Sequence, residues 1–108
     1  MESKEENLRK EYAELQQKLE DPAVFSTKNY PKLARRSNEL EKILDLFQKR
    51  SNLRKNKSEA VTLSQDTDSD LSEMAKDELT TIELQLTEVE SELASLLTPK
   101  DPNDERDA

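Results

Sequence analysis

The sequence contains no glycine, no cysteine and no histidine among its 108 residues. Phosphate-binding loops need glycine for positive φ and close backbone approach, so this composition excludes them and disfavours sheet folds. Without cysteine there is no disulfide framework or thiol nucleophile. Without histidine, the usual transition-metal sites and a Ser-His-Asp relay are also excluded. We therefore expect a chain that is not itself an enzyme and that needs no cofactor.

Hydrophobic residues are also scarce, at 31% against 39% charged residues. This ratio is lean for a globular core and favours an all-α fold of thin helices, each of which needs only an apolar stripe. No apolar run approaches the ~20 residues that span a bilayer, and the first ten residues lack the apolar core of a signal peptide. We expect a soluble, cytoplasmic protein with no membrane partner.

The apolar spacing predicts a first helix over residues 2–20. Its stripe follows spacings of four, three and four: Leu8, Tyr12, Leu15 and Leu19. Asp21-Pro22 should end this helix, because the residue before a proline disfavours the α region. Val24 and Phe25 lie in an otherwise polar connector, and we expect them to fold back and cap the end of the bundle.

A second helix is expected to begin near Tyr30-Pro31, with Asn29 as its N-cap. Its main stripe is Leu33, Leu40, Leu44 and Phe47, and Ile43, Leu46 and Leu53 broaden it. A middle helix that touches two neighbours needs such a wide apolar surface. The pattern leaves its end open, since residues 60–63 could extend it, and residues 64–69 are polar as in a turn.

The third helix is the clearest element. Asp68 is a good N-cap, and Asp70 and Glu73 lie where the helix dipole favours negative charge. A coiled-coil-like seam of three heptads follows: Ala75, Leu79, Ile82, Leu86, Val89, Leu93 and Leu96. The sequence thus predicts a three-helix arrangement over residues 1–98, in which a shorter first helix packs on a long antiparallel helical hairpin. Residues 99–108 are expected to form an extended linker.

Charge is strongly segregated behind the net charge of −8. Residues 28–57 hold ten basic and three acidic residues, whereas residues 58–108 hold three basic and fifteen acidic residues. One interpretation is that a basic second helix lies against an acidic third helix. The other is that exposed cations contact nucleic-acid phosphates.

The nucleic-acid hypothesis depends on Arg35, Lys42 and Lys49, which recur every seventh residue and share one side of the second helix. That side lies roughly opposite the apolar stripe at ~100° per residue. The three cations form a small phosphate-contact surface without interleaved aromatic residues for base stacking. The hypothesis therefore predicts contact with the nucleic-acid backbone rather than base reading.

Alternating carboxylates at Asp66, Asp68 and Asp70 could suggest a calcium loop. An EF-hand needs glycine at its sixth position and glutamate at its twelfth, which here hold Leu71 and Asp77. We therefore interpret these carboxylates as helix caps and expect no metal site.

The final third of the chain carries a specific motif. MAKDEL at residues 74–79 precedes the heptad helix, and LLTPKDPNDERDA follows at residues 96–108. This arrangement resembles the bacterial class I peptide chain release factors, and most closely the type that reads UAA and UAG. The matching junction residues are Pro99, Asp101, Pro102, Asp104, Glu105 and Arg106. LEDPAVFS at residues 19–26, followed by a Tyr-x-x-Leu helix start, is similar to the first helical connector of that family.

The resemblance implies the N-terminal helical domain of a factor that directs translation termination. In the family, the codon-reading loop and the Gly-Gly-Gln loop that promotes peptidyl-tRNA hydrolysis lie beyond this region, so no catalytic residue carries over. The resemblance also implies that the domain is an arm that reaches toward the stalk base of the ribosome, where it meets ribosomal RNA and protein. Arg35, Lys42 and Lys49 would then be candidates for the contact with ribosomal RNA. A GTPase release factor is implied as a further partner.

Two other functions fit parts of the sequence. A structural coiled-coil protein could self-associate through the third-helix seam, because a hairpin and a dimer bury the same residues. A small acidic regulator could bind basic partners. Only the acidic segment, residues 58–108, supports this alternative. The polar turn and the opposite charges of the second and third helices favour a monomeric hairpin.

Overall fold

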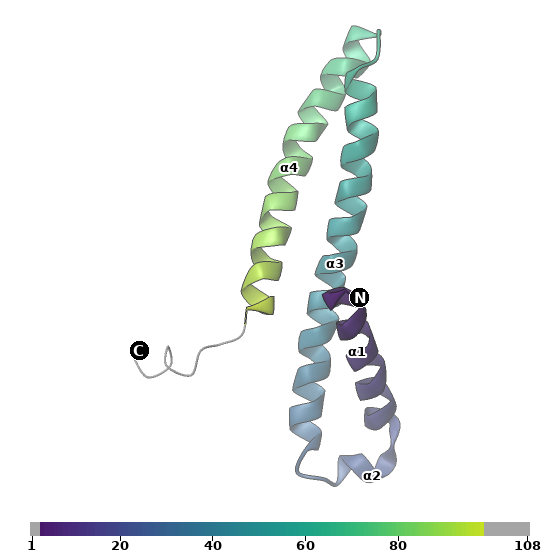
Figure 1. The fold of residues 1–108 in the computed structure, drawn as a ribbon, viewed down its shortest axis with the longest axis vertical. Coiled ribbons are helices and arrows are strands. Elements are labelled where there is room, and N and C mark those ends of the chain that lie inside the picture. Colours follow the sequence, from purple (N-terminus) through teal and green to yellow (C-terminus); the bar gives the residue numbers. More distant parts are fainter. Residues whose placement is uncertain (1–2, 99–108) are drawn as a thin grey trace, which may run out of the picture. The chain divides into compact units, whose positions relative to one another are not determined.

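The computed structural model describes residues 3–98, so the predicted linker lies outside the described residues. Within that range the chain is helical and contains no strand, which confirms the all-α prediction (Figure 1). The helices are α1 (Lys4–Glu20), α2 (Pro22–Phe25), α3 (Tyr30–Ser64) and α4 (Ser69–Leu97). The described residues divide into two compact units, one up to Phe47 and one from Gln48 onward, with α3 contributing to both.

Local capping explains where α1 begins and ends. The Ser3 hydroxyl accepts a hydrogen bond from the Glu6 N–H at 3.1 Å, which satisfies one of the free donors of the first turn. Glu5 and Glu6 add negative charge where the helix dipole favours it. The helix ends at Glu20, and its C-cap Asp21, the residue before a proline, is extended, as the sequence predicts.

The connector after α1 differs from the prediction, because it contains the one-turn helix α2. The Asp21 carboxylate accepts a hydrogen bond from the Ala23 N–H at 3.0 Å, and Pro22 occupies the first helical position. Proline suits that position because its φ is already helical and its missing N–H would have no partner there. Phe25 does not cap the bundle end. Its side chain is 58% exposed, and its ring lies against Tyr30.

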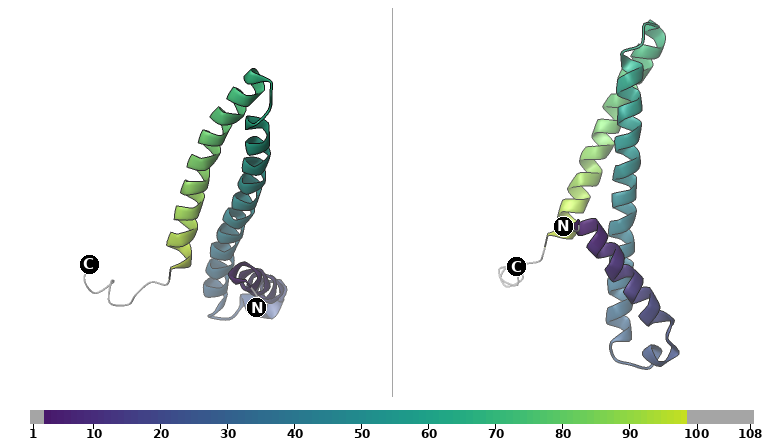
Figure 2. Two further views of the ribbon diagram at one scale, coloured as in Figure 1. Left: turned by 45° about the horizontal axis from the view of Figure 1, so that its top comes forward. Right: turned by 45° about the vertical axis from the view of Figure 1, so that its right-hand side comes forward.

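The first unit packs α1 against the N-terminal part of α3, which confirms the shorter first helix on a longer one (Figure 2). Its buried apolar residues are Leu8 and Leu15 from α1 and Leu40, Ile43, Leu44 and Phe47 from α3. Gln16 donates a hydrogen bond to the hydroxyl of buried Ser37 at 2.7 Å, so the polar group of Ser37 is satisfied.

In the second unit the C-terminal part of α3 and α4 form an antiparallel hairpin (Figures 1 and 2). Asp68 caps α4, as predicted: its carboxylate accepts hydrogen bonds from the Asp70 and Leu71 N–H groups. The Ser72 hydroxyl donates to the Ser64 carbonyl at 2.7 Å and satisfies one of the last carbonyls of α3. These bonds fix the turn that brings the two helices together.

Five of the seven predicted seam residues are buried within one chain, and the other two, Leu79 and Leu96, are half-buried. On α4 the buried apolar residues are Ala75, Ile82, Leu86, Val89 and Leu93, and on the hairpin part of α3 they are Leu53 and Ala60. Helix α3 continues to Ser64, so the extension that the sequence left open is real. Val61 and Leu63 are nevertheless exposed, because only Ala60 of that segment lies in the seam. None of the described helices is long and apolar enough to cross a membrane.

Candidate functional site

The predicted cationic residues are all exposed on α3. Arg35 and Lys42 belong to the first unit and Lys49 to the second. Arg35 donates a hydrogen bond from Nε to the Pro31 carbonyl at 3.3 Å, one turn earlier in the helix. Among the described residues, none of the three cations forms an ion pair, so their charges face solvent.

The surroundings of these cations differ between the two units. On an ideal helix Lys42 lies about 160° from Leu40 and Leu44, opposite the buried stripe of the first unit, as expected. Lys49 precedes buried Leu53 by four residues, which places the two side chains only about 40° apart. Lys49 therefore lies beside the buried side of the second unit rather than opposite it.

Opposite charges meet across the hairpin of the second unit. Arg54 on α3 lies 3.5 Å from the carboxylate of Glu90 on α4, and both side chains are about half exposed. An exposed pair of this kind stabilises a fold by only ~0–1 kcal/mol. It supports the interpretation that the basic helix faces an acidic one, although it accounts for only one of the basic residues.

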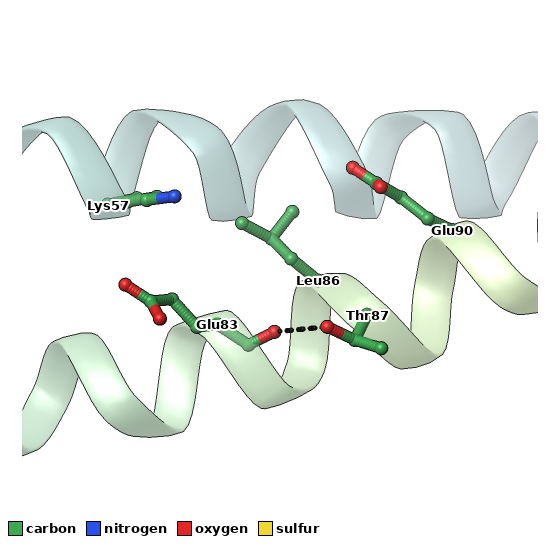
Figure 3. Close-up of a pocket in the computed structure, with 5 residues that line it drawn as sticks. All are labelled: Lys57, Glu83, Leu86, Thr87 and Glu90. Atoms are coloured by element: carbon green, nitrogen blue, oxygen red, sulfur yellow. Dashed lines mark hydrogen bonds between the residues drawn. The ribbon is translucent and has the colours of Figure 1, made fainter.

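A shallow groove of about 310 Å³ lies beside this pair (Figure 3). Its lining residues are Lys57, Glu83, Leu86, Thr87 and Glu90. The Thr87 hydroxyl donates to the Glu83 carbonyl at 2.9 Å, so this hydroxyl is used within α4. Within residues 3–98 no three potential metal ligands come together. The groove offers mixed charge around one leucine and no arrangement that resembles a catalytic centre.

The pKa values of two residues of the first unit, Glu11 and Arg36, are clearly shifted. The hydrogen bond from Arg36 lowers the pKa of the Glu11 carboxyl, which burial alone would raise. The pKa of Arg36 rises for the reciprocal reason, with Glu39 as a further partner. Both side chains are used to join α1 to α3, so we assign them a structural role.

Sequence reasoning missed one surface feature. Phe25 and Tyr30 form a ring contact at the α2–α3 connection, with Phe25 largely exposed and exposed Lys28 between them in the chain. The sequence pattern predicted that Phe25 caps the bundle end, and separately that no aromatic residue is interleaved among Arg35, Lys42 and Lys49. The sequence does contain a sign of this surface feature. Phe25 is an apolar aromatic residue in a stretch, Pro22 to Asn38, that contains no acidic residue.

Comparison with known proteins shows the family to which this sequence belongs. The PCRF domain model matches residues 8–108, nearly the whole chain. The chain belongs to the PCRF domain family. This PCRF domain is 39% identical over 105 residues to peptide chain release factor 1 of Lawsonia intracellularis, and the alignment covers 96% of the chain. It is 37% identical over 103 residues to peptide chain release factor 1 of Amoebophilus asiaticus, with 94% of the chain covered.

Peptide chain release factor 1 of Lactobacillus johnsonii is similar as well, at 34% identity over 104 residues and 94% of this chain. The resemblance seen in the sequence is thereby confirmed. The PCRF domain spans only 29% of the length of each of these three relatives. No solved structure matches it.

Proposed function

We propose that this PCRF domain is the N-terminal helical arm of a peptide chain release factor that acts in the cytoplasm at UAA and UAG stop codons. The observation that carries the proposal is its similarity to release factor 1 relatives over almost its whole length. Residues 1–98 form the arm, and residues 99–108 link it to the next domain. The arm is not an enzyme, and the codon-reading and hydrolytic groups belong to other parts of the factor.

The arm contacts the ribosome at the stalk-base region, through ribosomal RNA and protein, and a GTPase release factor is a further partner. Arg35, Lys42 and Lys49 are the proposed contacts to ribosomal RNA. Their exposure and their lack of ion pairs within residues 3–98 support this role. Cations that contact phosphates displace condensed counterions, which makes such binding favourable and dependent on salt.

A charge-reversal experiment tests the RNA contact. The variant R35E/K42E/K49E should cosediment with ribosomes roughly tenfold less tightly than the unmodified chain. The matched control K4E/K18E/K76E changes the net charge equally at three exposed lysines elsewhere. The control should retain most of the affinity. An equal loss in both variants would show that only the total charge matters and would remove the assigned contact.

A chimaera tests the larger proposal. This chain would replace the aligned residues of the Lawsonia intracellularis factor, and peptide release would be measured on ribosomes that display UAA, UAG or UGA. Release at UAA and UAG near the level of the parent factor is expected if the chain is a working arm. A chimaera that folds but binds ribosomes no better than the parent factor without its arm would contradict the proposal.

A further inference from the structure

At the α2–α3 connection, the exposure of Phe25 in its pair with Tyr30 is not explained by packing. The Phe25 and Tyr30 ring centroids lie 4.8 Å apart with an interplanar angle of 36°. Tyr30 is half-buried, whereas Phe25 leaves 58% of its surface in solvent. The contact with Tyr30 restricts the positions open to the Phe25 ring, which still presents apolar surface to solvent.

All charged residues in the stretch of chain around this pair are basic. Residues 22–38 contain four basic residues and no acidic residue. Arg36 is paired with Glu11 and Glu39. Lys28, Lys32 and Arg35 are exposed, and no ion pair within the described residues involves them. The N-terminal end of α3 adds a partial positive charge at the same place.

From these observations we propose that Phe25 and Tyr30 form a stacking site for an unpaired RNA base, with Lys28, Lys32 and Arg35 at the neighbouring phosphates. Proteins that bind single-stranded RNA combine aromatic faces with cationic side chains in this way, because every base has a π-face and every linkage a negative charge. The inference rests on the proposed ribosomal RNA contact and extends it. In the proposed function the cations contact only the RNA backbone, whereas here the chain also binds a base that has left the RNA stack.

An acidic protein segment is the main competing partner, since it would also be attracted by the three cations. The exposed ring decides between them. A flat, exposed aromatic face gains more from a planar base than from a carboxylate, which would be attracted to the lysines but not to Phe25. The two partners therefore predict different responses to removal of the ring and to removal of the charges.

The test measures binding of the chain to two fluorescently labelled RNAs, a hairpin with an unpaired loop and a fully paired duplex of equal length. Phe25→Ala should weaken binding to the loop about tenfold and leave duplex binding unchanged. Phe25→Trp should retain loop binding. Leu84→Ala is the matched control, because Leu84 is a similarly exposed apolar residue, at 64%, on α4. Circular dichroism would check that each variant folds.

The salt dependence separates stacking from charge. Phe25→Ala should leave the slope of log affinity against log salt unchanged, because it removes no phosphate contact. Lys28→Ala with Lys32→Ala should reduce that slope by roughly 1.4, the value for two contacts to a single strand. A slope that changes with Phe25 but not with the lysines would contradict the assignment of roles.

Several outcomes would overturn the proposal. The proposal would be wrong if Phe25→Ala bound the RNA loop as tightly as the unmodified chain. It would also be wrong if Leu84→Ala lost as much loop affinity as Phe25→Ala. If Phe25→Ala weakened ribosome cosedimentation but not loop affinity, the ring would contact a ribosomal protein instead of RNA. Should Phe25→Ala be inert while R35E/K42E/K49E impairs ribosome binding, the stacking site would fail and the proposed function would stand. If neither variant changed ribosome binding, the stacking site and the assigned ribosomal RNA contact would both fail, whereas the chimaera would still test the proposed function.

Discussion

Arg36 and Glu11 form a two-pronged ion pair between α3 and α1, with Nε 2.6 Å from Oε2 and Nη2 2.9 Å from Oε1. Parallel bonds of this kind fix orientation as well as distance, because the guanidinium plane must align with the carboxylate plane. Arg36 also reaches Glu39 one turn later on its own helix, at 2.6 Å. The arrangement aligns the short first helix against the long one.

We expect Glu11→Gln to lower the free energy of unfolding by about 0.5 kcal/mol at neutral pH, a small effect because both partners are more than a third exposed. The pKa of Glu11 lies below its ordinary value of 4.5 in the folded chain. The pair therefore stabilises the fold fully above pH 4.5 and loses this effect as the pH falls through the lowered value.

Urea unfolding of the unmodified chain and of Glu11→Gln between neutral and acidic pH would check this sign. The difference between the two should shrink as the pH falls. Arg36→Met combined with Glu11→Gln closes a double-mutant cycle and isolates the pair. A difference that grew in acid would show that the Glu11 carboxyl is stabilised in its protonated form.

Leu40→Ala should destabilise the first unit by about 2–5 kcal/mol, because Leu40 is completely enclosed and its truncation leaves a cavity. The core of this unit is thin, so a loss of that size should unfold α1 from α3. Leu84→Ala on the exposed side of α4 serves as the control and should change stability by less than about 0.5 kcal/mol. Thermal unfolding followed by circular dichroism compares them, and similar melting temperatures would contradict the assigned core.

Asp68→Ala should cost about 1 kcal/mol, because the carboxylate accepts hydrogen bonds from two N–H groups at the start of α4. Asp68→Asn keeps a side-chain oxygen at the same place and should retain most of that stability. Amide hydrogen exchange in the first turn of α4 would report the loss locally. Equal exchange rates in both variants would mean that charge, not capping geometry, stabilises this end.

The chain should sediment as a monomer of about 12.5 kDa over a wide concentration range. The physical reason is that Ile82, Leu86 and Val89 are already buried within one chain, so little of the seam remains for a second copy. Sedimentation equilibrium would check this. A mass that rises with concentration toward twice that value would favour the self-associating coiled coil over the hairpin.

The apolar periodicity was sufficient to predict most of the helices and the buried seam. Asp68 as a cap, the end of α1 before Pro22 and the buried positions from Ala75 to Leu93 all follow local rules of capping and spacing. The family was also readable from the chain, because a junction motif depends on residue identity rather than on packing.

Tertiary structure decided which side chains remain exposed. Phe25 is an apolar residue of the kind found in cores, yet it follows from a short helix capped by Asp21 that its side chain is largely exposed. Its ring contacts Tyr30. Lys49 matches Arg35 and Lys42 in spacing, but its surroundings depend on where Leu53 packs in the hairpin. Arg36 and Glu11 are 25 residues apart in the chain, and no local pattern pairs them. Periodicity specifies which face of a helix is apolar, whereas the neighbour that covers that face is fixed only when the helices pack.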